Sequence, residues 1–350
     1  MNPWLTYFLG AAIASLCAGW IVYPLLLHWN VIDRPNERSS HTRPTARGGG
    51  AGFIAVILVV GAWQLASSDD RAGLIIYVAA GVLAVVSFID DLKSLPAGIR
   101  FGCHALAAVA ALWFLNGVFE RSLGTELSPA LRGVILLISF CWITGYTNAF
   151  NFMDGINGIS GQQGLISAGG AVLIVSLSGA SVESPSAILL LLISGACLGF
   201  LPHNFPRARM FMGDVGSAPL GFLLAVGTIW LALETRLELL PALVLLHANY
   251  VLDTGITLAR RALRGDKWYT AHREHFYQRL IRAGRSHTWV TLAEATLLLI
   301  STGLLATYSR LELVERVFLA ATVVGIWIIF FLRAEFEFRR IPPEDEVARS

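Results

Sequence analysis

Acidic and amide side chains gather at the ends of long apolar segments of this 350-residue chain. Asp90 and Asp91 close one such segment, and Lys93 follows them. Adjacent carboxylates at a membrane boundary are costly unless they are paired, hydrated or bound to a metal, and they can hold Mg²⁺ or accept a proton. For this pair taken alone, a helix end hydrated by headgroup water is the simpler interpretation.

A second polar segment follows another apolar stretch. It contains Asn148, Asn151, Asp154, Gly155, Asn157 and Gly158. At helical spacing, Asn148, Asn151 and Asp154 share an arc of roughly 120° with Gly158. Their oxygens suit Mg²⁺ or a nucleotide, and the glycines allow a phosphate or base to approach the backbone. A polar helix cap is the alternative, but so many polar and glycine positions favour function.

Two further clusters have weaker signals. Asp214 lies between Gly213 and Gly216, where it could cap a helix or present a carboxylate to a metal. His272, Arg273 and His275 lie in a long basic loop and suit an anionic ligand such as a diphosphate. A solvated basic loop near anionic lipid is the alternative for this cluster.

The remaining polar positions fit ordinary structural roles when they are taken alone. A basic loop with His41 and Arg47 serves as a positive anchor at the membrane surface. His104 and His247 are interpreted as hydrogen-bonded within the bundle, and Asp253 as a supporting or ion-paired residue. The four cysteines lie in apolar segments without a CxxC pair, which supports neither a disulfide framework nor a zinc site.

The elements that must position these clusters are membrane helices. Hydrophobic residues make up 55% of the chain, charged residues only 14%, and the mean hydropathy is +0.63. Apolar runs of about 20 residues, long enough to span a bilayer, recur throughout. We expect an all-α polytopic membrane protein, with residues 1–335 forming a single transmembrane domain and 336–350 a short cytoplasmic tail. The eleven expected spans cover 4–28, 49–67, 72–89, 101–119, 130–147, 161–180, 186–202, 216–234, 238–258, 288–308 and 315–333.

Arginine and lysine are concentrated in alternate connections. The positive-inside rule therefore places the N-terminus outside and the C-terminus in the cytoplasm. All the clusters above then lie at the cytoplasmic face. An ion-coupled transporter is the rival class, because intramembrane acids and histidines also mark ion pathways. That class expects acids near the middle of spans, whereas these lie at the inner ends. A non-catalytic scaffold would leave the Asn/Asp/Gly segment unexplained.

Taken together and in order, the clusters resemble the polyprenyl-phosphate N-acetylhexosamine-1-phosphate transferase family, glycosyltransferase family 4. The resemblance runs from about Asp33 to His287. It covers the acidic pair, the NxxNxxDGxxG segment, the GDxGS motif, the His-containing loop and the first Pro/Arg/Gly loop. No single motif is specific, but five in order on one membrane face are.

The resemblance implies a bacterial inner-membrane enzyme that transfers a sugar-1-phosphate from a UDP-sugar to undecaprenyl phosphate at the cytoplasmic face. It implies Mg²⁺, with Mn²⁺ as an alternative, at Asp214 and Asn151, and a catalytic lipid-phosphate role for Asp90 or Asp91. No nucleic acid partner is expected, and a homodimer is left open. Nucleotide-sugar contacts are implied at Asn148, Asp154, Gly155, Asn157, Arg100, His272, Arg273 and His275, with supporting roles for Lys93, His41, Arg47 and Asp253.

The sequence departs from the family pattern in three ways. Asn157 stands where many members have Asp, so it is not an acid here, and Ser39 replaces a common Lys. The His loop lacks a triple-His run, which argues against a UDP-muramoyl-pentapeptide donor. The resemblance is closer to the branch that starts O-antigen, and hence lipopolysaccharide, synthesis. The implied donors are UDP-GlcNAc or 6-deoxy relatives such as UDP-FucNAc and UDP-QuiNAc.

Overall fold

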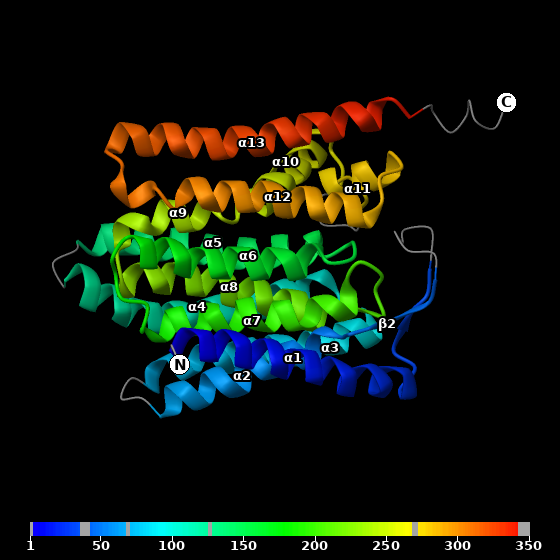
Figure 1. Ribbon diagram of the computed structural model, residues 1–350, viewed down its shortest axis with the longest axis horizontal. Helices are drawn as coiled ribbons and strands as arrows, with labels where there is room; N and C mark the ends of the chain where they lie inside the picture. The colour runs from blue at the N-terminus through cyan, green and yellow to red at the C-terminus, as the bar shows by residue number, and fades with distance from the viewer. Residues whose placement is uncertain (1–2, 36–42, 68–70, 125–127, 268–271, 342–350) are drawn as a thin grey trace.

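The protein is a bundle of long helices lying side by side, as the computed structural model shows (Figure 1). The structure describes residues 3–35, 43–67, 71–124, 128–267 and 272–341. His41 of the sequence prediction lies outside the described residues. The helices are α1 Pro3–His28, α2 Gly50–Ala66, α3 Leu74–Lys93, α4 Ala97–Leu123, α5 Pro129–Met153, α6 Ile159–Leu177, α7 Pro185–Asn204, α8 Asp214–Glu234, α9 Leu240–Leu245, α10 Ala248–Leu263, α11 Phe276–Arg282, α12 His287–Leu305 and α13 Leu313–Arg339.

The helices confirm an all-α polytopic membrane protein. Within the described residues, nine helices are long and apolar enough to cross a bilayer, and α9 with α10 forms a tenth candidate bent by 62°. The apolar helix α2 is shorter, with 17 residues. These elements coincide with the eleven expected segments, while the number of crossings and their orientation remain predictions. Helix α13 continues to Arg339, past the expected domain boundary at residue 335.

Helix α8 lies at the centre of the bundle. All its residues from Val215 to Leu233 are buried, and it packs against α2, α3, α4, α5 and α7. Glycines let the backbones approach closely around it, because a side chain would otherwise keep the helices apart. A Cβ on Gly50 of α2 would lie 2.3 Å from the Cα of Gly216 in α8, and a Cβ on Gly221 would lie 2.6 Å from Phe150 of α5.

A small three-stranded sheet closes one end of the bundle, near the label β2 in Figure 1. Strand β2, Thr45–Arg47, pairs antiparallel with β1, Ile32–Asp33, and parallel with β3, Met210–Phe211. The register sets Arg47 opposite Phe211, three residues before Asp214. The sheet therefore brings the first basic loop to the N-terminus of α8.

The predicted polar clusters converge on this same end. In Figure 1, β2 and α11 lie at the end of the bundle opposite the start of α1, where α13 also finishes. The start of α1 and the end of α13 are thus at opposite ends, as an odd number of crossings requires. The loops that the sequence assigns to one membrane face are close in space.

The crossing of α2 and α8 can be tested with Gly50→Ala. We expect this substitution to lower the free energy of unfolding by about 1–3 kcal/mol, because the added methyl group overpacks a backbone contact. Thermal unfolding in detergent would measure the change. Gly117→Ala is the matched control, since nothing lies within 4 Å of its Cβ position; equal destabilisation by both variants would contradict the close approach.

Candidate active site

Asp91 forms the centre of the polar end of the bundle. Its side chain is fully buried, and its Oδ1 lies 2.7 Å from the Nε of Arg47. The same carboxylate accepts hydrogen bonds from the backbone N–H groups of Asp214 and Val215, both at 3.0 Å. These are the first N–H groups of α8, which favour a negative charge. Asp91 therefore joins α3 to the N-terminus of α8 and to β2.

Arg47 links Asp91 to the second predicted acid. Its Nη2 lies 3.2 Å from Oδ1 of Asp214. Burial opposes the charge of Arg47, but the carboxylates of Asp91, Asp214 and Asp33 outweigh this effect and raise the pKa of Arg47 above its ordinary value. The guanidinium of Arg47 therefore stays positively charged, and it lies beside Asp214 on the side that faces the sheet.

Asp90 faces away from Asp91 and has different partners. Its Oδ1 accepts a hydrogen bond from the Leu95 N–H at 2.5 Å, and its Oδ2 lies 3.3 Å from Nη1 of Arg100. Its carboxyl is also close enough to interact with that of Asp214. Two carboxyl groups facing each other are repulsive unless a proton or a cation lies between them.

Asn151 completes an oxygen-rich set around Asp214. Its amide nitrogen donates to Oγ of Ser217 at 2.9 Å, and that hydroxyl donates to the carbonyl of Gly213 at 3.3 Å. The carbonyl oxygen of Asn151 is then the atom that can serve as a ligand. Among the described residues no group of three or more His, Cys, Asp or Glu side chains has metal-binding geometry. Two carboxylates and one amide nevertheless form the hard oxygen set that suits Mg²⁺.

Two cavities meet at Asp214. The first, of about 450 Å³, is lined by charged and polar side chains, Arg47, Asp154, Asn157 and Arg273 among them, together with apolar surface. The second, of about 320 Å³, lies between α3, α4 and α5. Its lining is mainly apolar but includes Asp90, Arg100, His104, Asn148 and Asn151. Asp214 lines both cavities, so one carboxylate can act on ligands from either side.

The connection between α5 and α6 forms the floor of the first cavity. Burial, together with the negative charges of Asp214 and Asp91, raises the pKa of Asp154 to about 7. Gly155 must be a glycine here, because a Cβ would lie 2.1 Å from the hydroxyl of Tyr277. Asn157 donates from its side chain to the Pro206 carbonyl at 3.1 Å. The loop is thus fixed by neighbouring elements before any ligand binds.

The predicted histidine loop is only partly turned toward the cavity. His275 is buried, and its Nδ1 lies 2.9 Å from Oδ1 of Asp253. Asp253 also accepts the N–H of Phe276 at 2.9 Å and so caps α11. His275 and Asp253 therefore hold the loop in place. Burial lowers the pKa of His272 to about 4, so this ring is neutral at physiological pH. Arg273 is the one of the three predicted loop residues that lines the first cavity.

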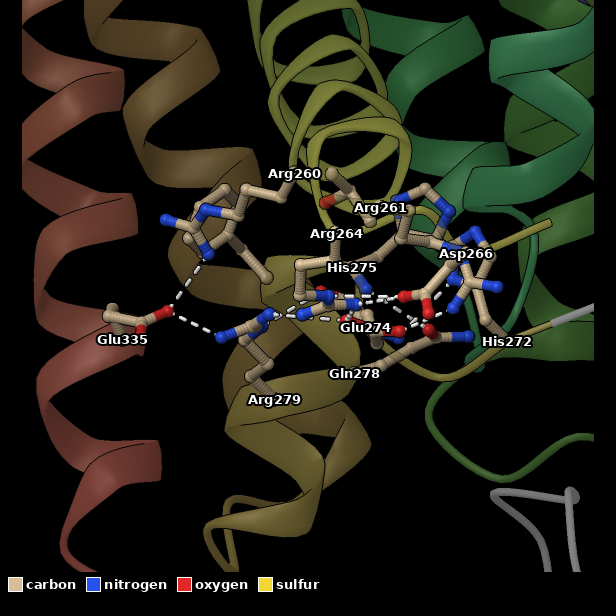
Figure 2. A network of polar contacts seen from close by, with 12 residues as sticks. Arg260, Arg261, Arg264, Asp266, His272, Glu274, His275, Gln278, Arg279 and Glu335 are labelled. Carbon is tan, nitrogen blue, oxygen red and sulfur yellow. Dashed lines mark hydrogen bonds and ion pairs between the residues drawn. The ribbon is translucent and has the colours of Figure 1, made fainter. Parts of the chain in front are cut away.

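Four arginines on either side of this loop are paired with glutamates, as Figure 2 shows. Arg264 lies 2.6 Å from Glu274, which also pairs with Arg261. Arg260 lies 3.0 Å from Glu335 of α13, and Arg279 contacts the same carboxylate. This network neutralises much of the positive charge that the sequence offers to a diphosphate, and it fastens the loop to α13.

Several cavity residues were missed by sequence reasoning. They are Asp33, Asn204, Gln278, Arg282 and His287. Gln278 and Arg282 are four residues apart, which puts both on one face of α11. That spacing is the feature of the sequence that could have identified them as neighbours in the site. Lys93, which was predicted to support the site, is exposed at the end of α3.

Comparisons with known proteins bear on this arrangement. A family model described as glycosyl transferase family 4 matches residues 73–232, from the start of α3 to near the end of α8. A decaprenyl-phosphate N-acetylglucosaminephosphotransferase of Mycolicibacterium smegmatis is 30% identical over 310 residues, covering 79% of this chain and 75% of the relative. A probable undecaprenyl-phosphate N-acetylglucosaminyl 1-phosphate transferase of Bacillus subtilis is 28% identical over 296 residues, covering 79% and 78%. A phospho-N-acetylmuramoyl-pentapeptide-transferase of Lacticaseibacillus paracasei is 32% identical over 239 residues, covering 63% and 71%.

The removal of Asp91 and the removal of Asp214 should lower the free energy of unfolding by different amounts. We expect Asp91→Ala to lower the free energy of unfolding by about 3–5 kcal/mol, because it leaves Arg47 and two backbone N–H groups without their partner. Asp214→Ala removes a partly exposed carboxylate whose ion pair with Arg47 spans 3.2 Å, and it should cost much less. Thermal unfolding of the unliganded protein would compare them. If Asp91→Ala were the milder change, the central role of Asp91 would be wrong.

Asp154 should make unliganded stability depend on pH. Its pKa is raised in the folded protein, so the folded state holds the proton more tightly than the unfolded state does. The contribution of Asp154 to stability therefore falls as the pH rises from about 4 to about 7. We expect Asp154→Asn to be more stable than wild type at pH 8, with a smaller difference at pH 5. Melting temperatures in EDTA would test this, and a difference independent of pH would contradict it.

Proposed function

Because the chain belongs to glycosyl transferase family 4 and is a multi-pass membrane phosphosugar transferase, we propose that it transfers N-acetylhexosamine-1-phosphate from a UDP-sugar to undecaprenyl phosphate. The products are UMP and a lipid-linked sugar diphosphate. The active site faces the cytoplasm of a bacterial inner membrane. The product starts O-antigen or another cell-envelope polysaccharide.

The meeting of the two cavities at Asp214 is the observation that carries this proposal. A nucleotide-sugar is polar and bears a diphosphate, which matches the first cavity with Arg47 and Arg273. A polyprenyl phosphate has an apolar chain and one charged end, which matches the second cavity with Asp90 and Arg100. The two substrates would then meet where their phosphates must react.

The oxygen set at this point fits a divalent cation. Asp214 and Asn151 would hold Mg²⁺ or Mn²⁺, with Asp90 close by. The cation would supply positive charge against the donor diphosphate, the main electrostatic lever in phosphoryl transfer. Arg47 would add a second, permanent charge beside the same carboxylate.

The structure favours different roles for the two predicted catalytic acids. Asp91 is committed to Arg47 and to α8, so it orients the site. Asp90 lines the second cavity and is the acid placed to steer the acceptor phosphate or take its proton. The acceptor phosphate would attack the phosphorus that bears the sugar, and UMP would leave toward Arg47 and Arg273.

The first cavity also bears on the donor. A volume of about 450 Å³ suits a UDP-N-acetylhexosamine, and the loop residues Asn157 and Gly158 are fixed by bonds to Pro206 and Asn204. The substrates we propose are UDP-GlcNAc and its 6-deoxy relatives.

UMP release by purified protein tests the reaction. We expect release from UDP-GlcNAc, UDP-FucNAc or UDP-QuiNAc that requires both undecaprenyl phosphate and Mg²⁺. Asp214→Ala should reduce the rate at least a hundredfold, because it removes a ligand at the reacting phosphates. Glu183→Ala, an exposed acid at the other end of the bundle, is the control and should retain activity. Folded protein that moves an ion but releases no UMP would favour a transporter instead.

A further inference from the structure

His104 lies in the cavity that the proposed function gives to the acceptor. It is buried in α4, four residues after Arg100, and both side chains line the second cavity. Residues four apart lie on one face of a helix, about one turn from each other. A buried histidine therefore lies beside the arginine that would meet the acceptor phosphate.

Asn148 of α5 fixes the tautomer of His104. Its side-chain nitrogen donates to the carbonyl of Thr144 at 2.8 Å, and a carbonyl can only accept. The Asn148 oxygen is therefore free to face the imidazole, with which Asn148 is hydrogen-bonded. Among the described residues Nδ1 of His104 has no partner, so the bond runs through Nε2–H. The neutral ring then carries its lone pair on Nδ1.

Arg100 offers the complementary donor. Its Nη1 is held 3.3 Å from Asp90, but within the described part of the chain its buried Nε–H has no partner. A buried donor and a buried acceptor, each unsatisfied, thus lie one turn apart on the same helix. Leaving such groups unpaired is costly, so an arrangement that joins them is favoured.

We propose that His104 is a positioning residue for Arg100. When Arg100 leaves Asp90 and turns its two terminal nitrogens to the acceptor phosphate, its Nε–H donates to Nδ1 of His104. This bond fixes the plane of the guanidinium, and a fixed plane is what two parallel hydrogen bonds to a phosphate require. A chain of contacts then runs from Thr144 through Asn148 and His104 to Arg100. The proposal rests on the proposed function.

Two substitutions at position 104 separate the ring nitrogens. An asparagine amide occupies roughly the place of Nδ1, whereas a glutamine amide occupies roughly the place of Nε2. We expect His104→Gln to raise the KM for undecaprenyl phosphate about tenfold while the KM for the UDP-sugar changes less than twofold. His104→Asn should keep the acceptor KM within about threefold of wild type. Equal acceptor KM values for the two variants would overturn the proposal.

A double-mutant cycle tests whether His104 acts through Arg100. Lysine has no equivalent of Nε–H, so Arg100→Lys should already raise the acceptor KM. Adding His104→Gln to that variant should then change the acceptor KM less than twofold. A full further tenfold increase would show that His104 acts independently of Arg100.

A binding measurement separates this inference from the proposed reaction. Undecaprenyl phosphate and undecaprenol are titrated into purified wild-type and His104→Gln protein. We expect the substitution to weaken binding of the phosphate about tenfold and to leave the alcohol unchanged. Equal weakening of both lipids would assign His104 to packing of the cavity and overturn the proposal. A wild-type protein that binds the phosphate but releases no UMP would contradict the proposed function instead.

Discussion

The site depends on the buried contact between one carboxylate and the start of one helix. Asp91 of α3 receives two backbone N–H groups of α8 and the guanidinium of Arg47. A helix N-terminus carries partial positive charge, so a buried anion there is stabilised by groups that water would otherwise solvate. This contact sets the position of Asp214, the first residue of α8, and through it the point where both cavities meet.

The other loops at the polar end are also held in place by charged side chains. Arg47 reaches α8 because the register of a short sheet places it opposite Phe211. The histidine loop is fixed through Asp253, which caps α11, and through Glu335 of α13, which pairs with Arg260 and Arg279. Many of the charged side chains at this end therefore hold the loops in place.

The sequence predicted the helical bundle and the gathering of the motifs at one end, because hydropathy and loop charge report directly on a membrane environment. It could not separate Asp90 from Asp91. Successive residues on a helix point about 100° apart, and only the packing of α3 on α8 decides which one is buried. The sequence predicted that His275 contacts a phosphate. It could not show that His275 pairs with Asp253, because Asp253 lies on another helix. Cavity residues such as Asn204 and His287 come from separate elements and share no motif.

The close approach of α2 and α8 has a mechanical consequence. Gly50 and Gly216 bring two backbones into contact, and Arg47 lies three residues before Gly50 while Asp214 lies two residues before Gly216. The crossing therefore lies within three residues of both Arg47 and Asp214. A change in tilt between α2 and α8, the kind of adjustment that helices make to bilayer thickness, would change the separation of these two side chains.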